Sequence, residues 1–247
     1  MRVAQPKASK GSQYWLQVLV NEQPERLNAP VREALGFDPT ANIEWRSPLA
    51  CDEFAEYRDE AFLNLLGIRL ERVPLEAFWP KRGPQWDALG LAGGNEPLLV
   101  EAKAHLAEFA SPPCQASQES LALIRKSLAG ARTFFCQEAA GPAQAAEPPG
   151  WTGTYYQYTN RLAHLYLLRN LNGIPAHLLF VNLVNASDVN GPTSADEWHE
   201  AIAACHCHLG LPMDRPLSHV GHVFVDVENL AYTGEQTRSG GPDCPIA

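Results

Sequence analysis

The sequence places a carboxylate, an amine and an imidazole at alternate positions of one apolar segment. The run LLVEAKAH, residues 98–105, begins as core material and then carries Glu101, Lys103 and His105. Because side chains alternate between the two faces of a strand, these three share one face. We expect Glu101 and Lys103 to do chemistry there, and His105 to be a hydrogen-bonded structural residue.

A second carboxylate precedes this strand. Residues 93–95, Gly-Gly-Asn, predict a hairpin turn that pairs residues 84–90 with the segment above and brings Asp87 near Glu101. Two adjacent carboxylates repel unless a cation lies between them. Two carboxylates with several waters suit Mg²⁺, and Lys103 beside the ion would orient or deprotonate a water. This pattern predicts metal-dependent hydrolysis of a phosphate ester.

Interleaved strand and helix patterns predict an α/β protein with a mixed central sheet flanked by helices. The expected strands are residues 12–20, 68–73, 84–90, 97–104, 176–184 and 221–227, and the expected helices are 24–35, 50–66, 116–129, 154–170 and 194–208. The apolar run AHLLFVNLV at 176–184 is typical of a central strand that is buried on both faces.

Composition limits the organisation and the partners of the chain. We expect one domain over residues 1–247, with the Ala/Pro-rich residues 141–150 as a surface loop. The net charge of −9 argues against a broad basic face for nucleic acid, although a local basic groove remains open.

No membrane partner is expected, because no apolar run is long enough to span a bilayer. Residues 1–15 lack the apolar centre of a secretory signal. The six cysteines are scattered, so we expect reduced thiols. Together these features predict a cytoplasmic protein.

The order strand-Asp, turn, strand-Glu-x-Lys resembles the PD-(D/E)xK nuclease superfamily, which has the restriction-endonuclease-like fold. The resemblance implies an αβββαβ core over about residues 50–185, with N- and C-terminal additions. The chain departs from the family pattern at Trp86, which replaces the Pro of a Pro-Asp pair. It also departs in the long connection from Lys103 to the helix at 154–170.

Carried over residue by residue, the resemblance makes Asp87 and Glu101 the ligands of Mg²⁺, with Mn²⁺ as a substitute, and Lys103 the catalytic lysine. Many members add a Glu from the first helix. Glu56 and Glu60 both fit, and Glu56 is preferred for its distance from the helix end.

The resemblance also implies roles for the helix at 154–170. Gln157 takes the place of a catalytic Gln near the start of the later helix in some families. Asn160 and Arg161, on the next turn, would bind the substrate phosphate.

The resemblance implies a Mg²⁺-dependent nuclease-like phosphodiester hydrolase that acts on nucleic acid. DNA is the expected substrate, RNA stays open, and a homodimer would suit cleavage of both strands. The alternative is a binding or structural protein that keeps the fold without the reaction. A zinc site in CHCH, residues 205–208, is not expected, because contiguous ligands on a helix point around its circumference.

Overall fold

The structure is a computed structural model that describes residues 1–137, 150–228 and 230. At its centre is a five-stranded sheet with the order β2-β4-β5-β6-β7. The strands are β2 (Ile43–Ser47), β4 (Ala88–Ala92), β5 (Glu96–Lys103), β6 (His177–Val184) and β7 (Val220–Asp226). The first three pair antiparallel and the last three parallel, so the sheet is mixed as the sequence predicts.

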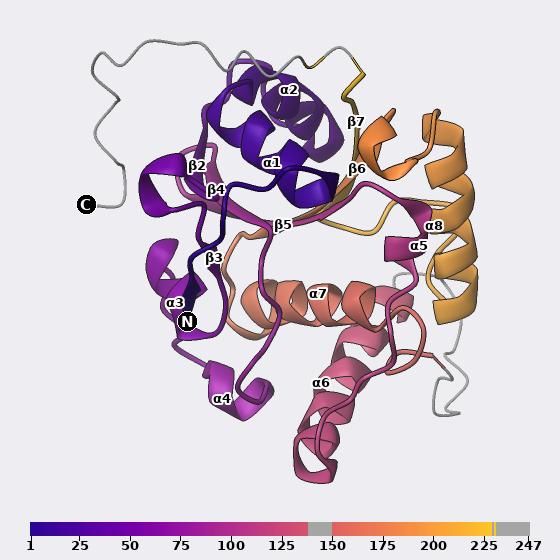
Figure 1. The fold of residues 1–247 in the computed structure, drawn as a ribbon. Coiled ribbons are helices and arrows are strands. Elements are labelled where there is room, and N and C mark those ends of the chain that lie inside the picture. The colour runs from indigo at the N-terminus through magenta and orange to yellow at the C-terminus, as the bar shows by residue number, and fades with distance from the viewer. Residues whose placement is uncertain (138–149, 229, 231–247) are drawn as a thin grey trace.

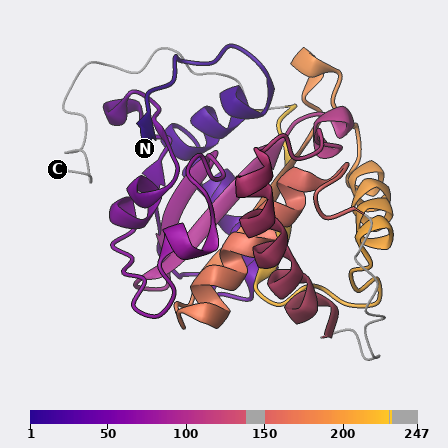
Figure 2. The same ribbon diagram turned by 90° about the horizontal axis from the view of Figure 1, so that it is seen from below.

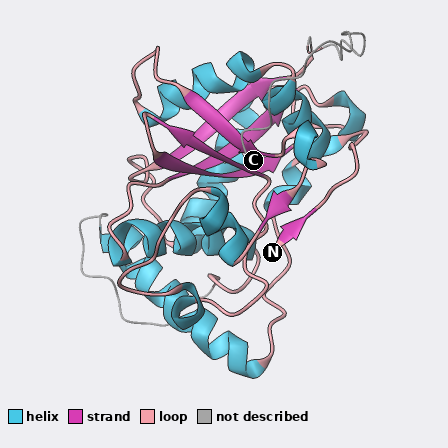
Figure 3. Ribbon diagram, turned by 90° about the vertical axis from the view of Figure 1, so that its left-hand side faces the viewer, coloured by secondary structure: helices cyan, strands magenta, loops and turns pink. Residues whose placement is uncertain are grey.

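Helices cover both faces of this sheet (Figures 1 and 3). They are α1 (Gly11–Asn21), α2 (Pro24–Leu35), α3 (Glu60–Leu65), α4 (Leu75–Phe78), α5 (Leu106–Phe109), α6 (Gln118–Gln137), α7 (Tyr156–Tyr166) and α8 (Ala195–Leu209). A π-helical turn, Leu167–Leu171, continues α7, and 3-10 turns form at Ala50–Asp52 and Ser187–Val189. Helices α1 and α2 lie on one face, and α7 and α6 lie across the other (Figure 2).

Alternation along β5 divides the core into two hydrophobic clusters. Leu98 and Val100 pack in the cluster on the side of α1 and α2, whereas Leu99 packs in the cluster that includes α7. Since Glu101 and Lys103 follow Leu99 at two-residue spacing, they too lie on the α7 face. Strand β6 is buried along its whole length, as predicted for a central strand.

The hairpin that carries the candidate site is confirmed. Strands β4 and β5 pair antiparallel, with Ala88 opposite Val100. The turn depends on Gly93 and Gly94, whose φ angles of 55° and 108° lie in the region that favours glycine. Asp87 lies just before β4, so the strand begins later than predicted.

The prediction of a strand over residues 12–20 is wrong, since this segment belongs to α1. Its aromatic and β-branched residues favour a strand by composition. However, Leu16, Leu19 and Val20 recur at helical spacing and enter the cluster beneath α1 and α2. Tertiary burial therefore outweighs local propensity.

The predicted helix over residues 50–66 is also wrong. Glu53 and Phe54 have positive φ angles of 53° and 49°, which interrupt the helix. The chain then forms β3 (Glu56–Tyr57), which pairs with β1 (Arg2–Val3), and only afterwards α3. This pairing with the first residues of the chain is nonlocal, so no local window reveals it.

The predicted strand over residues 68–73 does not form, and the first strand of the sheet is β2 instead. Its residues IEWRS alternate between buried and half-buried positions, a signal that could have identified it. The sheet therefore starts before residue 50. Helix α2 forms over the predicted residues 24–35, and the other predicted strands and helices form with shifted ends.

Three sequence-based expectations concern the wider chain. Residues 141–149 of the predicted loop lie outside the described residues. Cys114, Cys136, Cys205 and Cys207 are free as expected, whereas Cys51 is disulfide-bonded, contrary to the expectation. Among the described residues, no helix combines the length and apolar character needed to cross a membrane.

The central position of β5 is testable by cavity formation. Leu99 is fully buried, and replacing it by Ala should lower the free energy of unfolding by about 2–5 kcal/mol. Met213 is 58% exposed, and Met213→Ala should change the free energy of unfolding by less than about 0.5 kcal/mol. Denaturant unfolding measures both. Equal effects of the two substitutions would contradict the placement of Leu99.

Candidate active site

The hairpin fixes Asp87 beside Glu101. The backbone N–H of Asp87 donates to the carbonyl of Val100, and its carboxylate accepts a hydrogen bond of 2.8 Å from the N–H of Ala102. Both partner residues, Val100 and Ala102, belong to β5, the strand that carries Glu101. Asp87 and Glu101 are therefore neighbours across the β4–β5 hairpin, as the sequence predicts.

Glu101 is buried, with 3% of its surface exposed, and both of its oxygens are bound by cations. Lys103 Nζ donates to Oε1 at 2.6 Å. Arg161 Nε and Nη2 lie 2.7 and 2.5 Å from Oε2. Burial disfavours the charged carboxylate, but Arg161 and Lys103 outweigh burial and hold the pKa of Glu101 below its usual value. Glu101 is therefore ionised.

The pKa of Asp87 is shifted in the opposite direction. Burial of its carboxylate, and then repulsion by Glu101, raise the pKa of Asp87 well above its usual value. Lys103 opposes this shift without cancelling it. The pKa values of the two carboxylates are therefore shifted in opposite directions, that of Glu101 downward and that of Asp87 upward.

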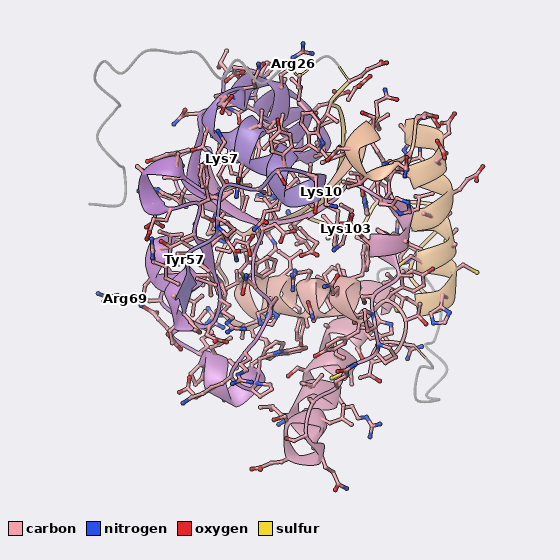
Figure 4. The ribbon with its side chains drawn as sticks, viewed as in Figure 1. Lys7, Lys10, Arg26, Tyr57, Arg69 and Lys103 are labelled. Atoms are coloured by element: carbon pink, nitrogen blue, oxygen red, sulfur yellow. The ribbon has the colours of Figure 1, made fainter. Side chains whose placement is uncertain are left out.

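Lys103 connects the hairpin to α7. Its ammonium donates to Glu101 and, at 3.0 Å, to the side-chain oxygen of Gln157. Burial favours neutral Lys103, but Glu101 and Asp87 overcome it and raise its pKa. Gln157 is held in turn, since its backbone N–H donates to Ser111 Oγ at 2.8 Å. Lys103 is thus a fixed positive charge and hydrogen-bond donor, on the side of the sheet that α7 covers (Figure 4).

Glu56 faces the same cleft from β3 instead of from a helix. Its carboxylate is buried and accepts hydrogen bonds from the amides of Gln5, Gln13 and Gln85. Burial raises the pKa of Glu56, and the charge of Glu101 adds to the shift. Glu60, the other candidate, is exposed at the start of α3.

These groups line one cleft of about 560 Å³. Its lining includes Glu56, Asp87, Glu101, Lys103, Gln157, Asn160 and Arg161, so the predicted site residues share one cavity. Sequence analysis missed Gln85, which also lines it. Gln85 lies two residues before Asp87, at the spacing of one strand face, and that signal could have identified it.

Arg161 uses its donors within the protein. Besides Glu101, it donates to the carbonyl of Gln85 at 2.8 Å and to Asn160 Oδ1 at 2.9 Å. Its guanidinium lies 4.9 Å from the centre of the Trp86 ring, within the range of a cation–π contact. In this arrangement Arg161 positions Glu101. Binding a phosphate, the role expected from the sequence, would require Arg161 to release some of these contacts.

The remaining histidine and cysteine signals lie outside the cleft lining. His105 caps α5, where its Nδ1 accepts from the N–H of Ala107, which confirms a structural role. In the segment 205–208, Cys205 and His206 are both buried, and His206 contacts Tyr158.

The donor set fits Mg²⁺ through Asp87 and Glu101. Within the described ranges, no group of three or more His, Cys, Asp or Glu residues could enclose a metal ion. Mg²⁺ does not need such a cage, since one or two carboxylates and retained waters suffice. Burial, and then repulsion by Glu101, raises the pKa of Asp87, and a bound cation would oppose both effects.

Comparison with protein-family models, with curated proteins and with solved structures gives no match to this chain. The interpretation of the cleft therefore rests on its own geometry and electrostatics.

The raised pKa of Asp87 predicts a pH-dependent effect of Asp87→Asn on stability. Because folding raises this pKa, Asp87 stabilises the protein at low pH and loses that contribution as pH rises through its folded-state pKa. Without metal, Asp87→Asn should therefore have a higher Tm than the wild type at pH 8, and the gain should shrink towards pH 3. Thermal unfolding in EDTA measures the difference.

Asp38→Asn is the matched control. Asp38 is exposed, and hydrogen bonds from Thr40 lower its pKa, so this substitution should give no gain at pH 8. A Tm gain for Asp87→Asn that is equal at both pH values would contradict the electrostatic explanation.

Proposed function

We propose that the chain is a Mg²⁺-dependent nuclease-like phosphodiester hydrolase that acts on nucleic acid, with DNA as the expected substrate. One observation carries the proposal. Glu101, Lys103 and Gln157 are linked by hydrogen bonds in a cleft that Asp87 also lines. The hairpin and α7 are far apart in sequence, and the combination of two carboxylates, a lysine and an amide suits phosphoryl chemistry.

The order of elements supports a restriction-endonuclease-like core. Helix α2, strands β2, β4 and β5, helix α7 and strand β6 follow one another as αβββαβ, with other short elements between them. Strand β6 lies parallel to β5, beside the strand that carries Glu101. In this proposal the core starts near residue 24, with α2 and β2 as its first helix and strand.

Asp87 and Glu101 would hold the ion. Bound Mg²⁺ would supply a Lewis acid that offsets negative charge on the phosphate and the leaving oxygen. Lys103, protonated and fixed by Gln157, orients the attacking water and attracts the phosphate oxygens. Glu56 has a raised pKa, which makes it a better proton acceptor than an ordinary carboxylate.

A second candidate function is a binding or structural protein without the reaction. The observation that favours it is the ion pairing of Glu101 with both Lys103 and Arg161, which neutralises the carboxylate without metal. The net charge of −9 also favours a protein without the reaction, because nucleic-acid binding relies on contacts between phosphates and cationic side chains. In that case the cluster would only stabilise the fold.

Cleavage assays separate the two functions. Single- and double-stranded DNA and RNA are incubated with Mg²⁺ or Mn²⁺ and either wild-type protein or Lys103→Ala. We expect metal-dependent cleavage by the wild type, reduced at least about 100-fold in Lys103→Ala, because a preorganised charge near the reacting phosphate is lost.

Lys126→Ala is the control, because Lys126 is an exposed lysine of α6. It should cleave like the wild type. Absence of cleavage on every substrate would favour the noncatalytic function. Cleavage unaffected by Lys103→Ala would reject the role of Lys103.

A further inference from the structure

The cleft that contains Glu101 has one cationic side chain without a partner. The cationic residues of its lining are Arg82, Lys103 and Arg161. Lys103 and Arg161 are both paired with Glu101, and Arg161 also donates to Asn160. Within the described residues, the guanidinium of Arg82 has neither a hydrogen bond nor an ion pair. Arg82 is therefore the cation of this lining that is available to a phosphate.

The backbone of Arg82 is fixed at the edge of the cleft, whereas its side chain is exposed. Its φ angle is 67°, in the left-handed region that residues other than glycine rarely adopt. The carboxylate of Asp59 accepts hydrogen bonds from the backbone N–H groups of Arg82 and Gly83, at 3.4 and 2.9 Å. The guanidinium thus extends from a held backbone and can turn towards a bound phosphate without breaking an existing contact.

The same lining has an aromatic ring that stacks on no other ring. Trp79 lines the cleft too, but it is 3% exposed and contacts the ring of His164, with centroids 4.9 Å apart. Tyr156 is half-buried at the start of α7, and within the described residues its ring contacts no other aromatic ring. A hydrogen bond with the side chain of Cys114 holds its hydroxyl. Tyr156 therefore offers a held aromatic face to a planar ring.

A nucleotide with an unpaired base has both groups that these two side chains bind. Its phosphate pairs with a guanidinium, and the face of its base stacks on an aromatic ring. In a duplex, neighbouring bases cover these faces, so a ring in a cleft reaches a base only after the nucleotide is extruded. Arg82 and Tyr156 together therefore favour a single strand over a duplex.

We propose that the cleft binds single-stranded DNA, with a phosphate on Arg82 and a base on Tyr156. The inference rests on the proposed function for the nature of the ligand, and it adds the strandedness of the substrate. Tyr156 directly precedes Gln157, which bonds Lys103, so the stacked base belongs to a nucleotide close to the reacting phosphate. Arg161 keeps its contacts with Glu101, and Arg82 takes the phosphate-binding role.

Fluorescence anisotropy of a labelled DNA strand of about ten nucleotides tests the proposal, since single-strand sites span about 4–16 nucleotides. Ca²⁺ replaces Mg²⁺, because both prefer oxygen ligands, and the strand is checked for integrity after titration. The duplex of the same sequence should bind at least about tenfold more weakly. Tyr156→Leu should weaken binding of the strand about tenfold, whereas Tyr156→Phe keeps the ring and should bind like the wild type.

Arg82→Ala tests the phosphate contact, and Arg26→Ala is its matched control. Arg26 is an exposed arginine of α2 outside the cleft lining (Figure 4). Arg82→Ala should weaken binding about tenfold and reduce the slope of log affinity against log salt by about 0.7, the value for one phosphate of a single strand. Arg26→Ala should change neither, although both substitutions remove one positive charge.

An abasic strand tests stacking on the wild-type protein. It keeps the phosphates and lacks the bases, so it should bind about tenfold more weakly than the ordinary strand. This comparison decides the role of stacking if Tyr156→Leu does not fold. Equal binding of strand and duplex, equal binding of the ordinary and abasic strands, or an effect of Arg82→Ala no larger than that of Arg26→Ala would overturn the inference.

Failure of the single-strand site and failure of the proposed function give different results. The expected binding pattern without cleavage of any substrate in Mg²⁺ would reject hydrolysis and leave the single-strand site. Metal-dependent cleavage of duplex DNA by a protein that lacks this binding pattern would reject the single-strand site and leave the nuclease.

Discussion

The burial of one ionised carboxylate, Glu101, imposes the arrangement of the cleft. An unpaired charge at this depth would be very costly, so cations must approach it closely. Lys103 does so from the same strand face, and Arg161 does so from α7. Gln157 then fixes Lys103, and Trp86 supports Arg161. The packing of α7 against the sheet and the electrostatics of the cleft thus depend on the same charge.

In the proposed function, the same constraint would favour binding of a divalent cation. Lys103 and Arg161 pair with Glu101, whereas burial and the charge of Glu101 keep the pKa of Asp87 well above its usual value. Bound Mg²⁺ would offset that repulsion and redistribute the contacts of Glu101. The Arg161 contact is then either an organising element of an active site or a permanent replacement for the metal.

Local sequence patterns predicted the hairpin, the shared face of Glu101 and Lys103, and the approach of Asp87, because these depend on strand alternation and a glycine turn. They also placed Gln157 and Arg161 on one helix. They failed where distant contacts decide the structure. Residues 12–20 form a helix because of tertiary burial, and Glu56 reaches the cleft because β3 pairs with residues 2–3. The pairing of Arg161 with Glu101 joins positions 60 residues apart, which no local pattern reveals.

A crystal structure with saturating Mn²⁺, analysed by anomalous scattering, would show whether Asp87 and Glu101 hold a metal ion together. We expect an anomalous peak within coordination distance of carboxylate oxygens from both residues, with at least one of the contacts from Lys103 and Arg161 to Glu101 lengthened. Absence of a peak in the cleft, with Glu101 still bound to both cations, would contradict it.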